Sequence, residues 1–442
     1  MLPLRMHLTP NRRPRKESPF IVSNTLGSPT LYLTYTGLTE PLGKSQVLPY
    51  VIGLGGRGYN VHVLSFEKSE TPLTFAKWNA PEVRSFALRY HKWPSIPATA
   101  LDVAQGMAAT ALFDLLGGIK LVHVRSYVPA LMALPWTRFR DLPFLFDMRG
   151  LWPDERIESG AWRREDPSYR AAKHIERILL RQSTAVTVLT ESMRRYLREE
   201  YPHRSEIRAP IWVIPTCTDL ELFRPDAPPH VETANALGSA RVLAYIGSLS
   251  GRYLPEEMAK FYLYWRKPSI PSRFLVVSRQ APASIRAILS SAGAESELVH
   301  CTADRQEVPG LLRCANAGIF LYREGLSTRG TSPTKAGEML ACGLPVAGNA
   351  VGDVDRILRG SGAGVIVHGT DDGSLAAAAA ELSALESEPD TSVRARRLAE
   401  TWFSLQRGID AYAALYEAIM MGGSGQLGDA TWPNHEMAKP PQ

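Results

Sequence analysis

In the first half of the chain, short apolar segments alternate with segments of helical periodicity, and this alternation constrains the fold more than any other feature. The apolar segments are rich in Val, Leu, Ile and aromatic residues, as strands buried on both faces are. We predict strands at 30–36, 60–66, 119–125, 143–149, 185–190 and 211–215, with helices at 44–58 and 171–183. Strands separated by single helices form parallel sheets that helices cover on both faces. The first half is therefore predicted to be a doubly wound α/β domain.

The same alternation begins again at residue 241. Strands are predicted at 241–249, 272–279, 297–302 and 317–323, with helices from Pro255 and at 281–293 and 307–315. Between the two series, "DAPPHVETANALGSA" (226–240) is rich in Pro and Ala, and we interpret it as a linker. The sequence thus predicts two Rossmann-like domains in tandem. Their ligands are expected in the cleft between them, at the carboxyl ends of the strands.

The composition argues against several classes of protein. Of the 442 residues, 45% are hydrophobic and 21% are charged, which is ordinary for a soluble globular enzyme. The net charge of +6 permits contact with phosphorylated substrates or an anionic membrane surface, but no dense basic stripe indicates nucleic acid. The four cysteines are scattered without a Cys-x-x-Cys pair, which argues against zinc and a disulfide framework. There is no apolar run of membrane-spanning length and no signal-peptide core, so we expect a cytoplasmic protein.

Residues 53–58 match the dinucleotide-binding pattern Gly-x-Gly-x-x-Gly, but in the wrong context. In that motif the glycines follow a strand and open a helix. Here they close a predicted helix and precede a predicted strand. We therefore interpret them as a helix end.

The stretch "GTSPTKAGEMLACGLPV" (330–346) has the context of an anion site, because it follows a strand and a loop. Ser332 is predicted as the N-cap of a helix and Pro333 as its first residue. The free N–H groups and the positive end of the helix dipole favour a phosphate there. Lys335 adds a full charge, and Glu338, three residues on, can accept hydrogen bonds from a sugar diol. The alternative is an ordinary capped helix with a Lys–Glu surface pair.

Four segments together carry a resemblance to a known family. They are "TYTGLTEPLGKSQVLPYV" (34–51), "FDMRGLWPDE" (146–155), "VIPTCTDLELFRP" (213–225) and "SPTKAGEMLACGLPV" (332–346). From about residue 28 to 420, the chain resembles the retaining glycosyltransferases of family 4, which have the GT-B fold. The resemblance implies a nucleotide-diphosphate sugar donor bound mainly by the second domain and an acceptor bound mainly by the first. It also implies a final helix that crosses back to the first domain.

The expected organisation combines this resemblance with the composition of the two ends. It comprises a basic flexible arm (1–27), an acceptor-side domain (28–225), the linker (226–240), a donor-nucleotide domain (241–398), crossing helices (399–420) and a disordered tail (421–442).

In the second domain, the resemblance assigns Glu338 to the second glutamate of the family's E-x7-E motif, which holds the donor ribose. The first glutamate of that motif falls at Gly330, and Glu324 or backbone N–H groups are the candidates to replace it. Ser248 stands where the family commonly has an arginine. Arg252 is the nearby cation, and Lys335 is expected to share the lost charge.

In the first domain, the resemblance assigns Gly37 and "PLGKSQ" to a glycine-containing loop close to the donor diphosphate. Gly43 and Pro41 are expected to shape the loop, and Lys44 to reach a phosphate; a solvated lysine is the alternative. Asp147 falls near the place where many relatives hold a histidine against the transferred sugar. For Asp147 and Arg149 the alternative is helix capping or an ion pair, and His123 and Arg125 are weaker candidates.

The resulting prediction is a glycosyltransferase that acts with retention in cell-surface polysaccharide or glycan synthesis, on a saccharide or lipid-linked acceptor. The predicted catalytic residues are Asp147, Arg149, Arg252 and Lys335, and the predicted donor-binding residues are Gly43, Lys44, Gly247, Ser248, Arg252, Ser332, Pro333, Thr334, Lys335 and Glu338. We expect no cofactor besides the nucleotide sugar as co-substrate, no metal ion, and weak contact with an anionic membrane. The alternatives are a sugar-nucleotide epimerase or phosphorylase of the same fold, and a donor-binding protein that has lost catalysis.

Overall fold

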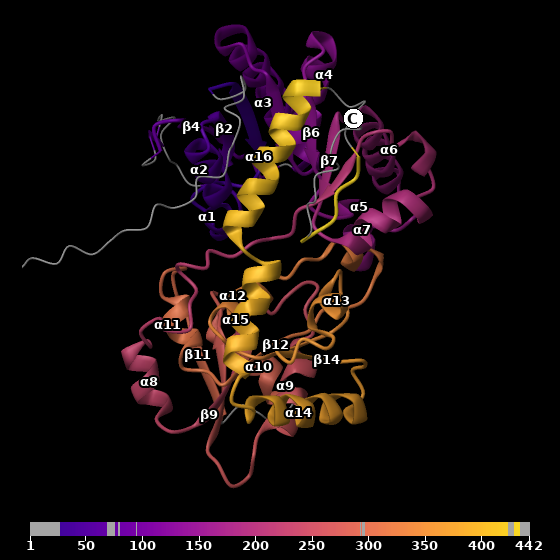
Figure 1. The fold of residues 1–442 in the computed structure, drawn as a ribbon. Coiled ribbons are helices and arrows are strands. Elements are labelled where there is room, and N and C mark those ends of the chain that lie inside the picture. The colour runs from indigo at the N-terminus through magenta and orange to yellow at the C-terminus, as the bar shows by residue number, and fades with distance from the viewer. Residues whose placement is uncertain are drawn as a thin grey trace, which may run out of the picture.

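The computed structural model describes residues 27–68, 76–77, 80–93, 95–291, 293, 297–422 and 428–433. In this part of the chain two separate sheets each form the centre of a domain, and the domains face one another (Figure 1). The predicted architecture of two facing Rossmann-like domains is confirmed. Of the expected basic arm, residues 1–26 lie outside the described residues.

The first domain is built on a sheet whose central strands are buried almost throughout. Within the described residues its strands are β1 (Pro29–Thr34), β2 (Asn60–Glu67), β3 (Ala76–Lys77), β4 (Val83–Arg89), β5 (Leu121–Arg125), β6 (Phe144–Asp147), β7 (Ala185–Val188) and β8 (Ile211–Val213). Their order is β3-β4-β2-β1-β5-β6-β7-β8, and all neighbours are parallel except β3 and β4.

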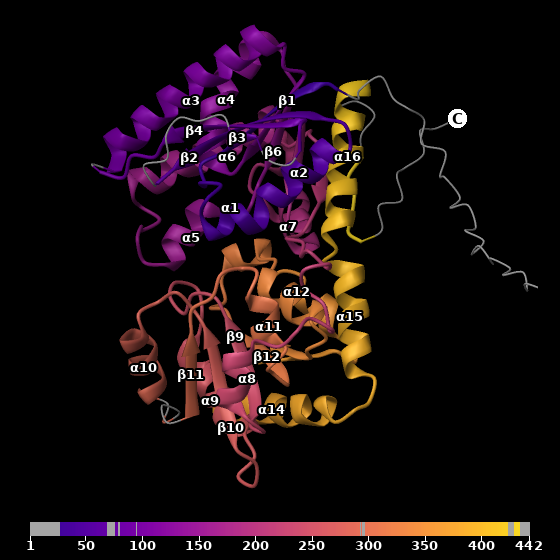
Figure 2. The ribbon, with the colours of Figure 1, turned by 90° about the vertical axis from the view of Figure 1, so that its left-hand side faces the viewer.

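Helices cover both faces of this sheet (Figure 2). They are α1 (Pro41–Gln46), α2 (Leu48–Gly56), α3 (Ser95–Gly117), α4 (Tyr127–Arg140), α5 (Trp152–Glu158), α6 (Pro167–Gln182) and α7 (Glu191–Arg195), with the turns η1 (Tyr196–Glu200) and η2 (Arg204–Glu206). The interpretation of residues 53–58 as a helix end is confirmed, because α2 ends at Gly56 and β2 begins at Asn60.

The second domain has a smaller sheet in which all paired strands are parallel. In the described chain its strands are β9 (Arg241–Ile246), β10 (Ser272–Val277), β11 (Leu298–Cys301), β12 (Ala317–Phe320), β13 (Val346–Gly348) and β14 (Gly364–Ile366), in the order β11-β10-β9-β12-β13-β14. Its helices are α8 (Val231–Leu237), α9 (Pro255–Trp265), α10 (Pro282–Ser291), α11 (Val308–Leu312), α12 (Thr334–Ala341), α13 (Val354–Leu358), α14 (Asp372–Glu386) and α15 (Thr391–Trp402), with the turn η4 (Leu326–Gly330).

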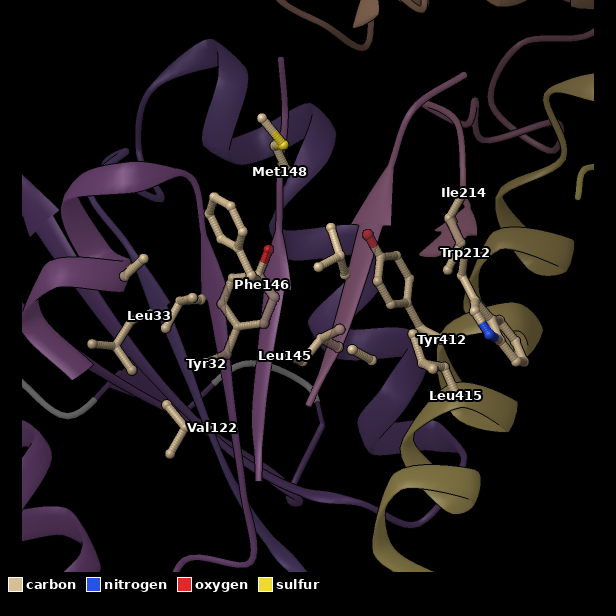
Figure 3. Packing of buried hydrophobic residues seen from close by; sticks show 14 of the residues in the cluster. Tyr32, Leu33, Val122, Leu145, Phe146, Met148, Trp212, Ile214, Tyr412 and Leu415 are labelled. Carbon is tan, nitrogen blue, oxygen red and sulfur yellow. The ribbon is translucent and has the colours of Figure 1, made fainter. Parts of the chain in front are cut away.

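The last helix, α16 (Leu405–Gly422), returns to the first domain and completes its core. Tyr412 and Leu415 of α16 face the side chains of the central strands, among them Tyr32 of β1 (Figure 3). A Cβ at Gly53 of α2 would lie 2.2 Å from Cδ1 of Ile409, so a glycine at this point lets α16 pack closely. The predicted return of the final helix to the first domain is confirmed.

The expected linker at 226–240 is not a free connection between the domains. It contains α8, and the Leu237 side chain of this helix is buried in the core of the second domain. The segment after 226 therefore contains a helix of the second domain. Its alanines favour a helix and its buried leucine anchors that helix, whereas the prolines only precede it.

The expected disordered tail is also corrected in part. Helix α16 continues to Gly422, and residues 428–433 lie against the first domain. Asp429 forms ion pairs with Arg194 and Arg198 at 3.0 and 2.6 Å, and Trp432 is buried. A polar, Gly-rich composition did not reveal this attachment, because besides two side chains it consists of backbone hydrogen bonds, such as those that join Ala430 to Ile211 and Val213. Residues 423–427 and 434–442 lie outside the described part of the chain. Among the described helices, none is both long and apolar enough to cross a membrane.

Candidate functional site

A cavity of about 1120 Å3 lies between the two domains. On the first-domain side its wall is α1 and the start of α2, including Lys44 and Gln46. On the other side, the wall consists of residues just beyond the carboxyl ends of β9, β10 and β11, together with the first turns of α12. Parallel α/β sheets bind their ligands at this edge. The cavity is therefore the place to look for chemistry.

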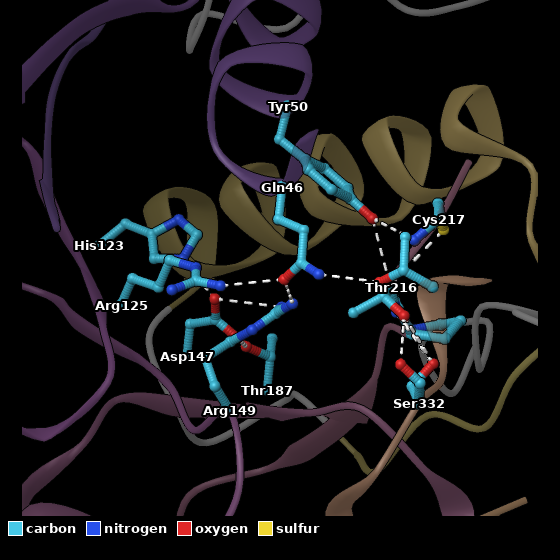
Figure 4. A network of polar contacts seen from close by, with 12 residues as sticks. Gln46, Tyr50, His123, Arg125, Asp147, Arg149, Thr187, Thr216, Cys217 and Ser332 are labelled. Atoms are coloured by element: carbon cyan, nitrogen blue, oxygen red, sulfur yellow. Dashed lines mark hydrogen bonds and ion pairs between the residues drawn. The ribbon is translucent and has the colours of Figure 1, made fainter. Parts of the chain in front are cut away.

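Helix α12 begins one residue later than predicted. Its first residue is Thr334 and its N-cap is Pro333, so the predicted N-cap role of Ser332 is wrong. The reason is a competing contact with Thr216: the Thr216 N–H donates to Oγ of Ser332 at 3.2 Å, and the Thr216 hydroxyl donates to the Ser332 carbonyl oxygen at 2.7 Å (Figure 4). Ser332 thus joins the two domains, whereas Thr334 and Lys335 line the cavity.

Lys335 is buried among three tyrosines. Its Nζ donates to the Tyr245 hydroxyl at 2.8 Å and lies 3.8 Å from the ring centre of Tyr253 and 5.9 Å from that of Tyr322. Burial lowers the pKa of Lys335 well below its ordinary value, and the Glu338 carboxylate offsets only part of this effect. An anion in the cavity would favour the protonated form. A bound anion would therefore promote protonation of the Lys335 amine.

Glu338 lies on the same face of α12 and forms part of the same wall. Its Oε1 accepts a hydrogen bond from Nη1 of Arg305 at 2.6 Å. Burial raises the pKa of Glu338, and the positive charge of Arg305 limits this rise. Arg305 also lines the cavity, and our sequence analysis missed it. Its place just beyond a predicted strand, at the edge where ligands bind, is the signal that would have identified it.

The glycine-containing loop of the first domain approaches the cavity from the opposite side. Gly43 is buried, and a Cβ there would lie 2.0 Å from the carbonyl oxygen of Gly37, so the packing of this loop requires a glycine. Lys44 is exposed at the cavity wall. The buried Glu67 carboxylate holds the loop and accepts a hydrogen bond from the Leu38 N–H at 2.6 Å.

The predicted donor-site residues in the loop after β9 line two different cavities. Gly247 and Ser248 line the cavity, whereas Arg252 lies in a neighbouring pocket of about 230 Å3. Nη2 of Arg252 is 2.5 Å from Oε1 of Glu155 in the first domain, and Nη1 donates to Oγ1 of Thr331 at 3.0 Å. Burial alone would lower the pKa of Arg252, but Glu155 raises it above its ordinary value. Arg252 is an interdomain contact in this structure.

Gly330 occupies the place of the family's first glutamate and is buried against the first domain. A Cβ at Gly330 would lie 3.2 Å from Cα of Gly150, which is a tight contact with backbone. Glu324 is exposed and lines a separate pocket. The structure therefore does not bring Glu324 to the cavity that Glu338 lines.

Behind the first-domain wall of the cavity, the buried Arg125 and the largely buried Arg149 converge on Gln46. Nη2 of Arg125 and Nη2 of Arg149 donate to Oε1 of Gln46 at 3.1 and 3.2 Å (Figure 4). Nε2 of Gln46 donates to Oγ1 of Thr334 at 2.8 Å. Gln46 thereby connects strand ends of the first domain with the first residue of α12 in the second.

Asp147 belongs to the same buried network. Its Oδ1 accepts from the Thr187 hydroxyl at 3.0 Å, and its Oδ2 lies 3.5 Å from Nη1 of Arg149 and 3.9 Å from Nε2 of His123. Burial alone would raise the pKa of Asp147, but Arg149 and His123 hold it well below its usual range. Burial lowers the pKa of His123, whose Nδ1 is 2.7 Å from the Tyr416 hydroxyl. The ion-pair alternative for Asp147 and Arg149 describes what the structure contains.

The cavity wall brings together part of the predicted set. The predicted residues that line it are Lys44, Gly247, Ser248, Thr334, Lys335 and Glu338. Gln46 and Arg305 of the cavity wall were not singled out from the sequence, nor were Tyr245, Tyr253 and Tyr322, which surround Lys335. Tyr322 lies near the carboxyl end of the predicted strand at 317–323, which is again the available signal, whereas Tyr245 lies in the middle of the predicted strand at 241–249. Among the described residues, no group of three or more His, Cys, Asp or Glu side chains could hold a metal ion.

Two glycosyltransferase families match successive parts of the chain. Residues 48–222 match Glycosyltransferase Family 4, and residues 240–384 match Glycosyl transferases group 1. The two matches together cover the sheet of the second domain and the strands of the first domain after β1, whereas β1, Lys44 and Gln46 precede the first match. No curated protein sequence matches the chain.

Solved structures with the same fold cover nearly the whole chain at low sequence identity. Sucrose-phosphate synthase from Thermosynechococcus elongatus has a TM-score of 0.68 at 16% identity, over 89% of this chain and 99% of that chain. WaaG, a glycosyltransferase involved in lipopolysaccharide biosynthesis, has a TM-score of 0.62 at 15% identity, over 89% and 100%. HepE of Anabaena, in complex with UDP and glucose, has a TM-score of 0.59 at 14% identity, over 87% and 98%. The shared fold and the two family matches agree: the chain is a glycosyltransferase of the GT-B fold, matched to family 4 over most of its first domain.

Proposed function

We propose that the cavity binds a nucleotide-diphosphate sugar, with the nucleotide on the second domain and the diphosphate at the start of α12. The observation that carries this proposal is the pairing of Lys335 and Glu338 on one helix face at the cavity wall. Lys335 and the free N–H groups of α12 suit the diphosphate. The Glu338 carboxylate, positioned by Arg305, suits the two hydroxyls of a ribose. Lys44 faces them from the first domain.

The proposed reaction transfers the sugar with retention, as the resemblance to retaining enzymes suggests. The bond between the anomeric carbon and the diphosphate oxygen breaks, and the acceptor hydroxyl oxygen bonds to the same carbon from the same face. The proton of that hydroxyl passes to the departing phosphate oxygen. Lys335 and the N–H groups of α12 would stabilise the negative charge that develops on the diphosphate.

The first-domain network has a supporting part in this proposal. Asp147 and Arg149 lie behind Gln46, and we assign them to positioning rather than to contact with the reacting atoms. Gln46 would be the group that these residues hold in place. The acceptor is proposed to be a saccharide or a lipid-linked sugar, in the synthesis of a cell-surface glycan.

A thermal-shift screen with UDP, GDP, ADP and their sugars tests the donor site. We expect one nucleotide series to raise the melting temperature and Glu338→Ala to abolish that shift while the fold remains intact. The matched control is Glu324→Ala, which removes an exposed carboxylate outside the cavity and should leave the shift unchanged. If Glu338→Ala keeps wild-type donor affinity, the ribose assignment is wrong.

A second candidate is a donor-binding protein without transferase activity. It is favoured by Gly330, which stands in place of the family's first glutamate and where even a Cβ would lie 3.2 Å from Cα of Gly150. Release of free nucleotide from the donor sugar that gives the largest shift separates the two candidates. Hydrolysis or transfer supports the enzyme, and tight binding without either supports the second candidate.

A further inference from the structure

Helix α3 exposes an apolar face along most of its length. The exposed residues include Leu101, Leu112, Leu115 and Leu116, with exposed fractions of 48%, 56%, 66% and 79%. Together with the exposed alanines between Leu101 and Leu112, they recur every three or four residues and so form one stripe on the helix. An apolar stripe of this length on a soluble protein usually contacts a partner.

The inner face of α3 is bonded to the rest of the first domain. The exposed stripe therefore belongs to a firmly packed helix. The acidic residues of α3 are Asp102 and Asp114, and both are buried. Asp102 accepts a hydrogen bond from the Tyr35 hydroxyl at 2.6 Å. Asp114 accepts from Nε1 of Trp136 at 3.0 Å and from Nε of Arg140 at 3.1 Å, both on α4. Figures 1 and 2 show α3 and α4 on the outside of the first domain, away from the second.

Aromatic and cationic side chains border the stripe. Trp93, just before α3, is 87% exposed, and Phe139 on α4 is 77% exposed and packs beside Trp136. The exposed cations at the two ends are Lys92 before α3, Lys120 after it and Arg138 on α4, whereas Arg140 is paired with Asp114; the exposed acid next to them is Asp141. The border is therefore mainly positive.

We propose that this face, made of the outer leucines of α3 with Trp93 and Phe139, docks the protein on an anionic lipid surface. A helix of 23 residues is about 34 Å long and can lie in the plane of the membrane interface. Leucines then enter the acyl boundary, aromatic rings take the headgroup level, and the cations face anionic lipid. A second copy of this chain suits this face less well than anionic lipid does, because a symmetric pair would bring the same cations together.

The location of the face connects it with the cleft. Asp102 of α3 is bonded to Tyr35, which directly follows β1 and leads into the glycine-containing loop beside the cavity. A membrane on α3 would therefore lie on the element that braces the acceptor side of the cleft. This last link rests on the proposed lipid-linked acceptor, whereas the docking face itself does not.

Vesicle flotation of the full-length protein tests the proposal without donor or acceptor, so its result is independent of the proposed reaction. The vesicles contain phosphatidylcholine alone or phosphatidylcholine with phosphatidylglycerol, each at low and high salt. We expect flotation with the anionic vesicles at low salt and less at high salt. The double variant Leu115→Gln with Leu116→Gln should lower the bound fraction about tenfold or more, since burial of each leucine drives insertion.

Matched controls come from the second domain. Val231→Gln changes a 68% exposed apolar residue on α8, and Lys267→Gln changes an exposed cation; both should float as the wild type does. Lys120→Gln with Arg138→Gln should weaken flotation with anionic vesicles only. Absence of flotation, or equal flotation of the leucine variant, would overturn the proposal. A wild-type dimer that the leucine variant converts to monomers, without vesicle binding, would assign the face to a second copy instead.

Discussion

Lys335 shows how a single residue can couple charge to ligand. Its ammonium group is surrounded by tyrosine rings, and burial lowers its pKa well below the ordinary value of 10.5. A bound diphosphate would raise this pKa again, because it places negative charge beside the amine. The residue therefore links donor binding to proton uptake.

The first prediction is that UDP binding takes up a proton at pH values between the lowered pKa of Lys335 in the free protein and its higher pKa in the complex. Because protons enter on binding, affinity for UDP should fall as pH rises through this window. Calorimetric titrations in buffers of different ionisation enthalpy measure the uptake, and Lys335→Gln should abolish it. An unchanged uptake in that variant would mean that another group titrates.

Glu67 is a buried carboxylate with a structural task. Besides the Leu38 N–H, it accepts from the hydroxyls of Thr39 at 2.6 Å and Ser65 at 2.8 Å. The second prediction is that Glu67→Gln lowers the free energy of unfolding by about 1–3 kcal/mol, because an amide N–H would face these donors. Weaker UDP binding should accompany the loss, since the loop borders the cavity. Denaturant titration and the thermal shift measure the two effects.

The control for Glu67 is Glu82→Gln, which changes an exposed carboxylate of the same domain and should alter neither measurement. A Glu67→Gln protein that is destabilised but binds UDP as the wild type does would show that the loop holds its shape without this carboxylate.

At the residue scale, sequence reasoning reached the groups that share one helix and missed those that meet through the fold. Lys335 and Glu338 are three residues apart, so helical spacing alone placed them together. Arg305 is distant in sequence from Glu338, and only the arrangement of parallel strands joins them. The donor-site prediction for Arg252 met the opposite case. The family pattern places Arg252 near the motif, but its guanidinium pairs with Glu155 of the first domain.

At the scale of elements, α16 is separate in sequence from the domain that it completes. Leu415 is fully buried there among strands of the first domain. The third prediction is that Leu415→Ala lowers the free energy of unfolding by about 2–5 kcal/mol through the cavity it leaves. The loss should appear in the unfolding transition of the first domain. The control on the same helix is Met421→Ala, 68% exposed, for which a change below about 0.5 kcal/mol is expected.

The strands were predictable because their apolar runs are short and bounded by turns, as β9 and β12 illustrate. Helix α3 was not singled out, and its composition explains why. Its buried and exposed faces are both apolar, so the residues show no helical period that would separate an inside from an outside. The same property that hid the helix in the sequence makes its outer face unusual in the structure.

At the scale of the whole molecule, the ion pair between Glu155 and Arg252 connects the two domains beside the cavity. The fourth prediction follows from a choice that Arg252 faces: it can pair with Glu155 or turn toward a bound diphosphate. Glu155→Gln should raise UDP affinity and Arg252→Gln should lower it, each by at most about fivefold, because a partly exposed ion pair is worth up to about 1 kcal/mol. Calorimetry of both variants and of the double variant measures the competition. If neither single change alters affinity, Arg252 is a tie between the domains only.

In the described part of the chain, the two connections between the domains are bonded to each other. The Thr218 N–H donates to the carbonyl oxygen of Phe403 at 2.6 Å, and the Leu405 N–H donates to that of Thr218 at 3.1 Å. Two adjacent connections that are bonded to each other favour a hinge motion and oppose a twist of one domain against the other. We therefore expect relative motion of the domains to be limited to opening and closing about one axis. Each closure would then restore the hydrogen bond between Gln46 and Thr334, so the cleft would regain its alignment after a product has left.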